Sequence, residues 1–143
     1  MRKPRLRFLG RVDGLDVYLV SGEHVRNVLD VDFTAGGNEA IYPAYIPPGE
    51  IWLDDALHAL DRNATCLHEI VERELMLNDG MDYDHAHDIA SAREKIFRKE
   101  MAKRRPTKFD ARRVSAALAE FQKARKTTSR QLDREVAAVL RRR

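Results

Sequence analysis

Short apolar runs separated by turn-forming residues dominate the first half of the chain. The runs are rich in Val, Ile, Leu, Phe and Tyr, and Asp-Gly, Ser-Gly, Gly-Gly and Pro-Pro-Gly sequences lie between them. Both features are typical of short β-strands joined by tight turns. The pattern therefore predicts four strands in a small, twisted, mainly antiparallel sheet, at residues 5–12, 15–22, 28–35 and 51–55.

The segment between the third and fourth predicted strands, residues 38–50, contains three prolines. Proline lacks the backbone N–H that a central strand needs, so Pro43, Pro47 and Pro48 exclude a central strand here. We expect an edge strand or a loop that turns near residues 48–49.

The apolar period changes to three and four residues in the second half of the chain, which predicts helices with one buried face. The first helix is expected at residues 63–78, with Asp61 or Asn63 as its cap and residues 78–80, Asn-Asp-Gly, as its end. Its predicted buried positions are Ala64, Leu67, Val71 and Leu75.

Three more helices are expected, at residues 82–103, 110–125 and 128–143. The predicted fold is therefore α+β: a small sheet packed on the first helix and a second helix, with a C-terminal helical extension. We expect one domain over residues 1–105 and a basic helical extension over residues 106–143.

Composition adds an expectation about location. The chain has 143 residues, of which 43% are hydrophobic and 34% are charged. No apolar run approaches the roughly 20 residues that cross a bilayer, and the basic N-terminus lacks the long apolar stretch of a secretion signal. We expect a cytoplasmic protein without a membrane partner, in which the single cysteine, Cys66, is a buried small side chain.

Residues 67–75, LHEIVEREL, place a histidine and a glutamate four residues apart. These positions lie on one face of a helix, so His68 and Glu72 can direct an imidazole nitrogen and a carboxylate oxygen at one ion. Glu69 lies about a quarter turn away, where it could reach a water molecule on the metal. The motif predicts two ligands and one catalytic carboxylate, as in the His-Glu-x-x-His helix, where the glutamate is the general base.

A catalytic zinc ion needs a third protein ligand. The short turn after the first helix forces the second helix to fold back beside it. There His87 lies next to the apolar stripe, whereas His85 points nearly half a turn away. We therefore expect Zn²⁺ to be held by His68, Glu72 and His87. Glu94, two turns beyond His87, is expected as an alternative ligand or as a carboxylate that orients an imidazole.

Other interpretations fit the same residues. The helix could be only charged and solvated, with His87 a hydrogen-bonded core residue. The constellation could also be a structural metal site or a buried polar network in a non-enzymatic protein. A structural site would be closed by a fourth ligand, for which Glu94, His58 and Cys66 are the local candidates. An open position beside a groove would indicate an enzyme.

A longer pattern, HExxE followed by YxxAHxxA and a glutamate, carries a resemblance. It occupies residues 68–72 and 83–90 and ends at Glu94. Together with residues 32–55, it resembles a group of small proteins common in phage and prophage genomes, which are similar to minimal zincin metallopeptidases. The resemblance covers about residues 28–99 and leaves the basic C-terminal segment outside.

The resemblance implies a zincin-like fold in which an edge strand, supplied by residues 40–46 or 49–55, binds an extended peptide. It implies a zinc metallopeptidase with a peptide or protein substrate, in the host cytoplasm if the protein is phage-encoded. Glu69 would move the proton, and Tyr83 would hydrogen-bond a metal-bound water or ligand; Tyr83 could equally be a packing residue at a helix start. Because Glu72 replaces the second histidine, the bound water would be less acidic.

The net charge of +3 conceals an acidic middle segment and a basic end. Residues 12–92 carry three Lys or Arg against seventeen Asp or Glu, whereas residues 93–143 carry eighteen against six. A basic helical arm can bind the phosphate backbone of nucleic acid, or its apolar residues can pack on the domain or on a second copy as a helical hairpin. The predicted nucleic-acid contacts, in this alternative, are Lys103, Arg104, Arg105, Lys108, Arg112 and Arg113.

Overall fold

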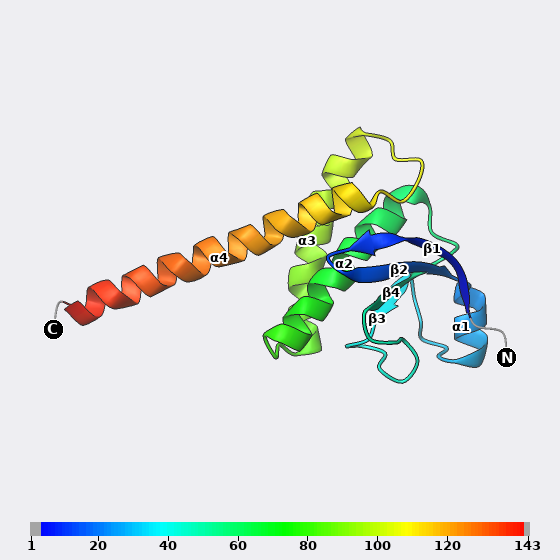
Figure 1. Ribbon diagram of the computed structural model, residues 1–143, viewed down its shortest axis with the longest axis horizontal. Coiled ribbons are helices and arrows are strands. Elements are labelled where there is room, and N and C mark those ends of the chain that lie inside the picture. Colours follow the sequence, from blue (N-terminus) through cyan, green and yellow to red (C-terminus); the bar gives the residue numbers. More distant parts are fainter. Residues whose placement is uncertain (1–3, 142–143) are drawn as a thin grey trace.

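The described residues form a four-stranded sheet and four helices. The computed structural model describes the backbone of residues 4–141 (Figure 1), and the side chains of all of these except residues 127–133, 135–136 and 140. The strands are β1 (Arg5–Val12), β2 (Leu15–Val20), β3 (Gly36–Asn38) and β4 (Glu50–Asp54). The helices are α1 (Gly22–Val28), α2 (Ala59–Asn78), α3 (Tyr83–Lys103) and α4 (Ala111–Arg141).

The sheet has the strand order β1-β2-β4-β3, so β1 and β3 are its edges. β1 pairs with β2 and β3 pairs with β4 in antiparallel orientation, whereas β2 and β4 run parallel. The chain passes from β2 to β4 through α1 and β3. The predicted α+β fold with a small, mainly antiparallel sheet is confirmed.

The strand predicted at residues 28–35 is wrong, because local polar groups turn the chain there. Ser21 Oγ accepts a hydrogen bond from the His24 backbone N–H and caps the short helix α1. After α1, an Asp30 carboxylate oxygen accepts from the Asp32 backbone N–H, which fixes a turn. The edge strand β3, Gly36–Asn38, lies mostly between the predicted strand and the proline-containing segment, and turns fill residues 39–49, in agreement with the loop expected from the prolines.

α2 begins four residues earlier than predicted and ends where it was predicted to end. Neither Asp61 nor Asn63 caps the helix. His58 occupies the N-cap position, and its side chain makes no capping hydrogen bond. Asn63 is buried instead, and it joins the helix to the start of α4: its Nδ2 donates to the Lys108 carbonyl and its Oδ1 accepts from the Asp110 backbone N–H. At the other end, Gly80 adopts a φ of 65°, which terminates the helix.

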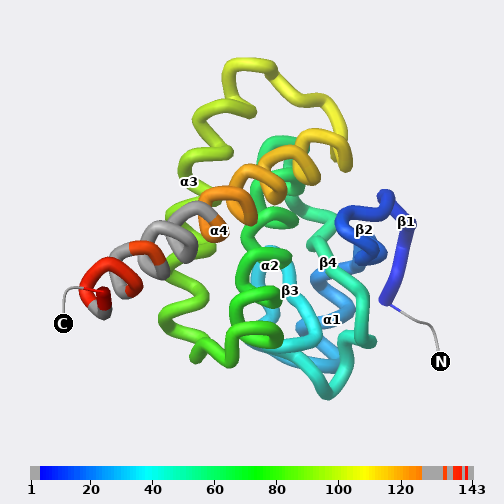
Figure 2. The backbone as a smooth tube through the Cα atoms, turned by 60° about the vertical axis from the view of Figure 1, so that its left-hand side comes forward, coloured from blue at the N-terminus to red at the C-terminus, as the bar shows by residue number. Residues whose placement is uncertain are grey.

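α2 is the central element of the domain. It packs on β3 and β4 on one side and against α3 and the first part of α4 on the other (Figure 2). One apolar cluster contains Leu67 and Val71 of α2 together with residues from the sheet, α3 and α4. A second cluster, around Trp52 and Phe33, fills the opposite face of the sheet under α1 and the turns. The site residues on α2 are therefore fixed from both sides.

α4 is one continuous helix, so the prediction of two helices, and of a hairpin, is wrong. No Gly or Pro interrupts residues 111–141, and the Thr residues at 127 and 128 lower helix propensity only slightly. Its first part joins the main core through Val114, Leu118 and Phe121, while residues 142–143 lie outside the described part. None of the helices described here is long and apolar enough to span a membrane. The division at residue 105 and self-association through the C-terminal segment stay predictions.

Candidate metal centre and cleft

His68 and Glu72 form a buried pair on α2. Nε2 of His68 lies 3.1 Å from Oε2 of Glu72. Glu72 is only 1% exposed and His68 only 7% exposed, because the neighbouring residues Leu67 and Val71 point into the main core. A carboxylate removed from water costs free energy unless it is paired with a cation. As a carboxylate, Glu72 therefore needs a positively charged partner, which can be a protonated imidazole or a metal ion.

His87 approaches the same carboxylate from α3. Its Nδ1 lies 3.0 Å from Oε2 of Glu72, so a single oxygen contacts both imidazoles. The two rings meet edge to face, with their centroids 4.8 Å apart. His85, in contrast, is an exposed residue whose Nδ1 lies 2.6 Å from the carboxylate of Asp82. The helical hairpin thus brings His87, and not His85, to His68 and Glu72.

These three side chains could hold a metal ion. One ligand atom from each of His68, Glu72 and His87 lies within 4.8 Å of the others. Four-coordinate zinc, with bonds of about 2.0–2.1 Å, holds its ligand atoms roughly 3.3 Å apart, close to the 3.0 and 3.1 Å found here. Two imidazole nitrogens and one carboxylate oxygen are also a ligand set that zinc accepts.

His68 is set in an unusual electrostatic environment. Burial disfavours the charged ring, but the contacts with the carboxylates of Glu72 and Glu94 outweigh burial and raise the pKa of His68 to about 10. His68 is therefore protonated at neutral pH in the metal-free protein, and it occupies the place of a cation beside Glu72. Metal binding must displace this proton.

Glu69 is a buried carboxyl group that faces the same cleft without belonging to the ligand triad. Its Oε1 accepts a hydrogen bond of 3.1 Å from Asn38 Nδ2 on β3, and the same amide group donates to the Glu69 carbonyl at 3.2 Å. Burial, reinforced by the negative charge of Glu72, raises the pKa of Glu69 to about 8. A carboxyl group with a pKa near neutrality can both accept and return a proton.

We expect the metal-free protein to lose stability as the pH rises. The folded pKa values of His68 and Glu69, about 10 and about 8, lie above the ordinary values of 6.5 and 4.5 for these groups. The folded state then binds more protons than the unfolded state, so the free energy of unfolding falls with pH across this range. The midpoint temperature of unfolding, measured in the presence of a chelator, should fall by roughly 5 °C between about pH 6 and pH 9. His68→Gln should flatten this dependence and His85→Gln should leave most of it; a midpoint that rises with pH would contradict the expectation.

Glu94 reaches the other nitrogen of His68. Its Oε1 lies 2.9 Å from Nδ1 of His68, off the axis of the ring N–H, so the contact is mainly between charges. Its Oε2 accepts a 2.6 Å hydrogen bond from Nε of Arg98. Burial alone would raise the pKa of Glu94, but these two cationic partners lower it. Glu94 is therefore a carboxylate that touches a potential ligand from outside the triad.

Tyr83 and Tyr42 place two phenols at the cleft. The Tyr83 hydroxyl lies 3.5 Å from Nδ1 of His87, and the two rings are 5.3 Å apart. Burial, with the charges of Glu72 and Glu69, raises the pKa of Tyr83. Tyr42, from the turn after β3, also lines the cleft, and burial and the charge of Glu69 raise its pKa. Both hydroxyls therefore remain protonated donors at neutral pH.

The triad opens onto a cleft of about 430 Å³. One wall is formed by Thr34, Ala35 and Gly36, at the start of the edge strand β3. The strand expected at residues 49–55 is instead inside the sheet, and residues 40–46 form turns. A Cβ atom on Gly36 would lie 2.9 Å from Thr65 Cγ2 and 2.8 Å from the Trp52 carbonyl oxygen. Glycine thus lets the edge strand pack closely on α2.

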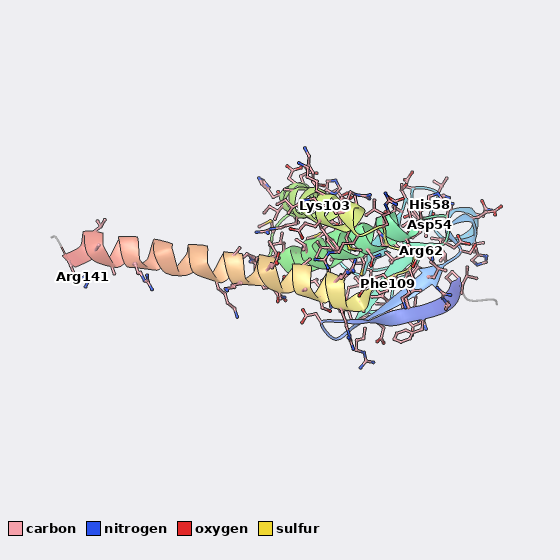
Figure 3. All side chains as sticks on the ribbon, turned by 90° about the horizontal axis from the view of Figure 1, so that it is seen from above. Asp54, His58, Arg62, Lys103, Phe109 and Arg141 are labelled. Atoms are coloured by element: carbon pink, nitrogen blue, oxygen red, sulfur yellow. The ribbon has the colours of Figure 1, made fainter. Side chains whose placement is uncertain are left out.

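The candidates for a fourth protein ligand do not join the triad. Among the described side chains, the metal-capable group contains only three residues. Cys66 belongs to the main core, where burial raises the pKa of its thiol, and His58 lies at the start of α2 (Figure 3). Three residues that line or support the site were not predicted from the sequence, because no motif marks them: Asn38, Tyr42 and Arg98. For Arg98 the four-residue spacing to Glu94 was an available signal.

Comparison of the chain with protein-family models, with curated proteins and with solved structures finds no match. The fold and the site are therefore described by their own geometry: an α+β domain whose central helix and its neighbour form a histidine and glutamate group that could hold a metal ion, beside an edge strand.

Proposed function

We propose that this protein is a zinc-dependent hydrolase that cleaves peptide bonds. The observation that supports the proposal most strongly is that one cleft contains the ligand triad, a buried carboxyl group with a pKa near 8, and the first residue of an edge strand. The ligand set has the composition of hydrolytic zinc sites that use two histidines and one glutamate.

Zinc, when bound by His68, Glu72 and His87, would supply a Lewis acid that polarises a carbonyl group and makes water more acidic. The protein itself would supply the proton transfers. Glu69 takes a proton from the attacking water as the oxygen adds to the carbonyl carbon, and it returns that proton to the nitrogen as the C–N bond breaks. Asn38 holds the Glu69 carboxyl group in place through its 3.1 Å hydrogen bond.

The substrate would bind as an additional strand along β3. β3 is an edge strand of the sheet, and its first residue, Gly36, lines the cleft. The Gly36 N–H and the Asn38 carbonyl are already hydrogen-bonded within the chain, so an extended peptide would pair chiefly with the Gly36 carbonyl. Tyr83, on the opposite wall, would donate a hydrogen bond to the carbonyl oxygen as negative charge develops on it. A peptide placed between the two walls has its scissile bond above the triad.

Chelator treatment tests the proposal. A mixture of unlabelled peptides incubated with the protein should show cleavage that a strong chelator abolishes and that zinc restores. The change expected is complete loss, because both the polarised carbonyl and the activated water depend on the ion. New peptide termini are measured by mass spectrometry. Cleavage that continues unchanged in chelator, in protein shown to be free of metal, would contradict the proposal.

A second candidate function is nucleic-acid binding by the basic residues between α3 and α4. Lys103 is the last residue of α3, and Arg104 and Arg105 follow it. Lys108 and Arg112 lie before and within the first turn of α4, and all five residues are exposed. Figure 3 shows Lys103 at the outside of the domain and Arg141 at the far end of α4. Arg113 differs from the others because its Nε lies 3.4 Å from Asp110. A group of exposed cations favours contact with phosphates.

Replacing Lys103, Arg104 and Arg105 with glutamine should weaken the binding of double-stranded DNA, because a cation that neutralises a phosphate releases a counterion. The plot of the logarithm of the binding constant against the logarithm of the salt concentration should become less steep. The steepness should decrease by about 0.9 for each phosphate that is no longer neutralised. Fluorescence anisotropy at several salt concentrations measures it. A variant with Arg134 and Arg141 replaced serves as the comparison; equal weakening in both would show that general charge, and not this corner, is responsible.

A further inference from the structure

A chain of charged contacts connects the first turn of α2 to the candidate metal centre. Asp61 Oδ1 lies 2.7 Å from Nη1 of Arg98, and Nε of Arg98 donates to Oε2 of Glu94 at 2.6 Å. The other oxygen of Glu94 lies 2.9 Å from Nδ1 of His68. The chain therefore leaves α2 at Asp61, passes through two residues of α3, and returns to α2 at His68.

We propose that Arg98 is a positioning residue, which holds the Glu94 carboxylate against Nδ1 of His68 so that Nε2 faces the metal. The inference rests on the proposed metal centre. Arg98 belongs to neither the ligand triad nor its direct contacts. It acts through Glu94, as carboxylates that hold a ligating histidine do in metalloproteins.

The geometry explains why an arginine is needed at this position. The Glu94 side chain is partly exposed and has three rotatable bonds, so without a partner it can turn toward water. Arg98 prevents this because its planar guanidinium group uses Nε for Glu94 and Nη1 for Asp61 at the same time. Asp61, being on α2, ties the position of Arg98 to the helix that carries His68. A lysine could keep the charge but could not make both hydrogen bonds in this fixed arrangement.

The direction in which zinc affinity changes when Arg98 is replaced distinguishes a positioning role from a purely electrostatic one. Removing a cation close to a metal site should strengthen metal binding, because the repulsion between two positive charges disappears. Loss of positioning should weaken it, because His68 and Glu94 gain rotational freedom that binding must remove. Arg98→Lys keeps the charge without the paired hydrogen bonds, so only the positioning role predicts weaker binding in that variant.

The test measures zinc affinity in the full chain by competition with a chromophoric chelator. Arg98→Lys and Arg98→Met should bind zinc roughly tenfold more weakly than the wild type, and Glu94→Gln at least as weakly. Arg93→Met is the matched control: Arg93 precedes Glu94 on the same helix, and its guanidinium group lies 5.4 Å from the Phe121 ring centre, away from the cleft. We expect the affinity of this control to be unchanged.

Cobalt provides a second readout. The visible spectrum of the cobalt-loaded protein reports ligand geometry, and it should change in both Arg98 variants and stay unchanged in Arg93→Met. Arg98 variants that bind zinc as tightly as the wild type, or more tightly, would overturn the inference even if their thermal stability were lower, because Arg98 would then be only a structural ion-pair residue. Failure of the wild type itself to bind zinc would overturn the metal centre and the inference together, so the two failures are distinguishable.

Discussion

Protein purified without a histidine tag is expected to contain about one zinc ion per chain, and His68→Ala or His87→Ala is expected to remove nearly all of it. Each substitution leaves two of three ligands, and the remaining buried carboxylate of Glu72 is left with one imidazole neighbour instead of two. Elemental analysis against protein concentration measures the ratio. The effect should be large because zinc affinity depends on all three protein ligands acting together.

The matched control for this prediction is His85→Ala. His85 is two residues from His87 on the same helix, but it is exposed and pairs with Asp82 instead of Glu72. We expect His85→Ala to keep the metal. No metal in the wild type after incubation with zinc would contradict the candidate metal centre, and equal loss of zinc in His85→Ala and His87→Ala would contradict the assignment of the third ligand.

Glu69→Gln is expected to lower kcat for peptide hydrolysis by roughly 10²–10⁴-fold while the zinc content stays the same. Glutamine has nearly the same shape, and its Oε1 can still accept the hydrogen bond from Asn38. It cannot take a proton from water, however, so the defect should appear in kcat. Initial rates over a range of peptide concentrations, with metal content measured on the same samples, give the result.

Glu74→Gln is the control for the proton-transfer residue. Glu74 is on the same helix as Glu69, but its side chain contacts Gln122 of α4 and does not line the cleft. We expect its activity to be close to that of the wild type. Full activity of Glu69→Gln at equal zinc content would contradict the proposed role of Glu69, and it would leave the metal centre intact.

Local pattern was sufficient to predict the features that depend on one element or on two consecutive elements. The spacing in LHEIVEREL put His68 and Glu72 on one face, and the short turn after α2 required α3 to return beside it, which brought His87 next to Glu72. The end of α2 at Asn78 also follows from a local signal, since the Asn-Asp-Gly sequence at residues 78–80 supplies a glycine that adopts a positive φ.

Features that depend on distant contacts were not predictable in the same way. Asn38 and Glu69 are 31 positions apart in the sequence, and Asp61 and Arg98 are 37 apart. No local sequence pattern predicts either hydrogen bond. The apolar residues at 28–35 have strand character, but the Asp30 and Ser21 side chains satisfy backbone N–H groups and favour a turn and a short helix. The edge strand β3 is too short and too rich in glycine to have a strand signal of its own.

The candidate metal centre and the proposed peptide wall come from different parts of the chain. All three potential ligands, with Glu94, Arg98 and Asp61, belong to the hairpin of α2 and α3, whereas β3 supplies the edge strand and Asn38. The contact between Glu72 and His87 spans 15 positions, whereas the contact between Asn38 and Glu69 spans 31, so bringing the ligands together costs less chain entropy. Substitutions in the turns next to β3 would therefore change the proposed peptide wall and leave the ligands of the candidate metal centre unchanged, whereas β3 itself has no room for a side chain at Gly36.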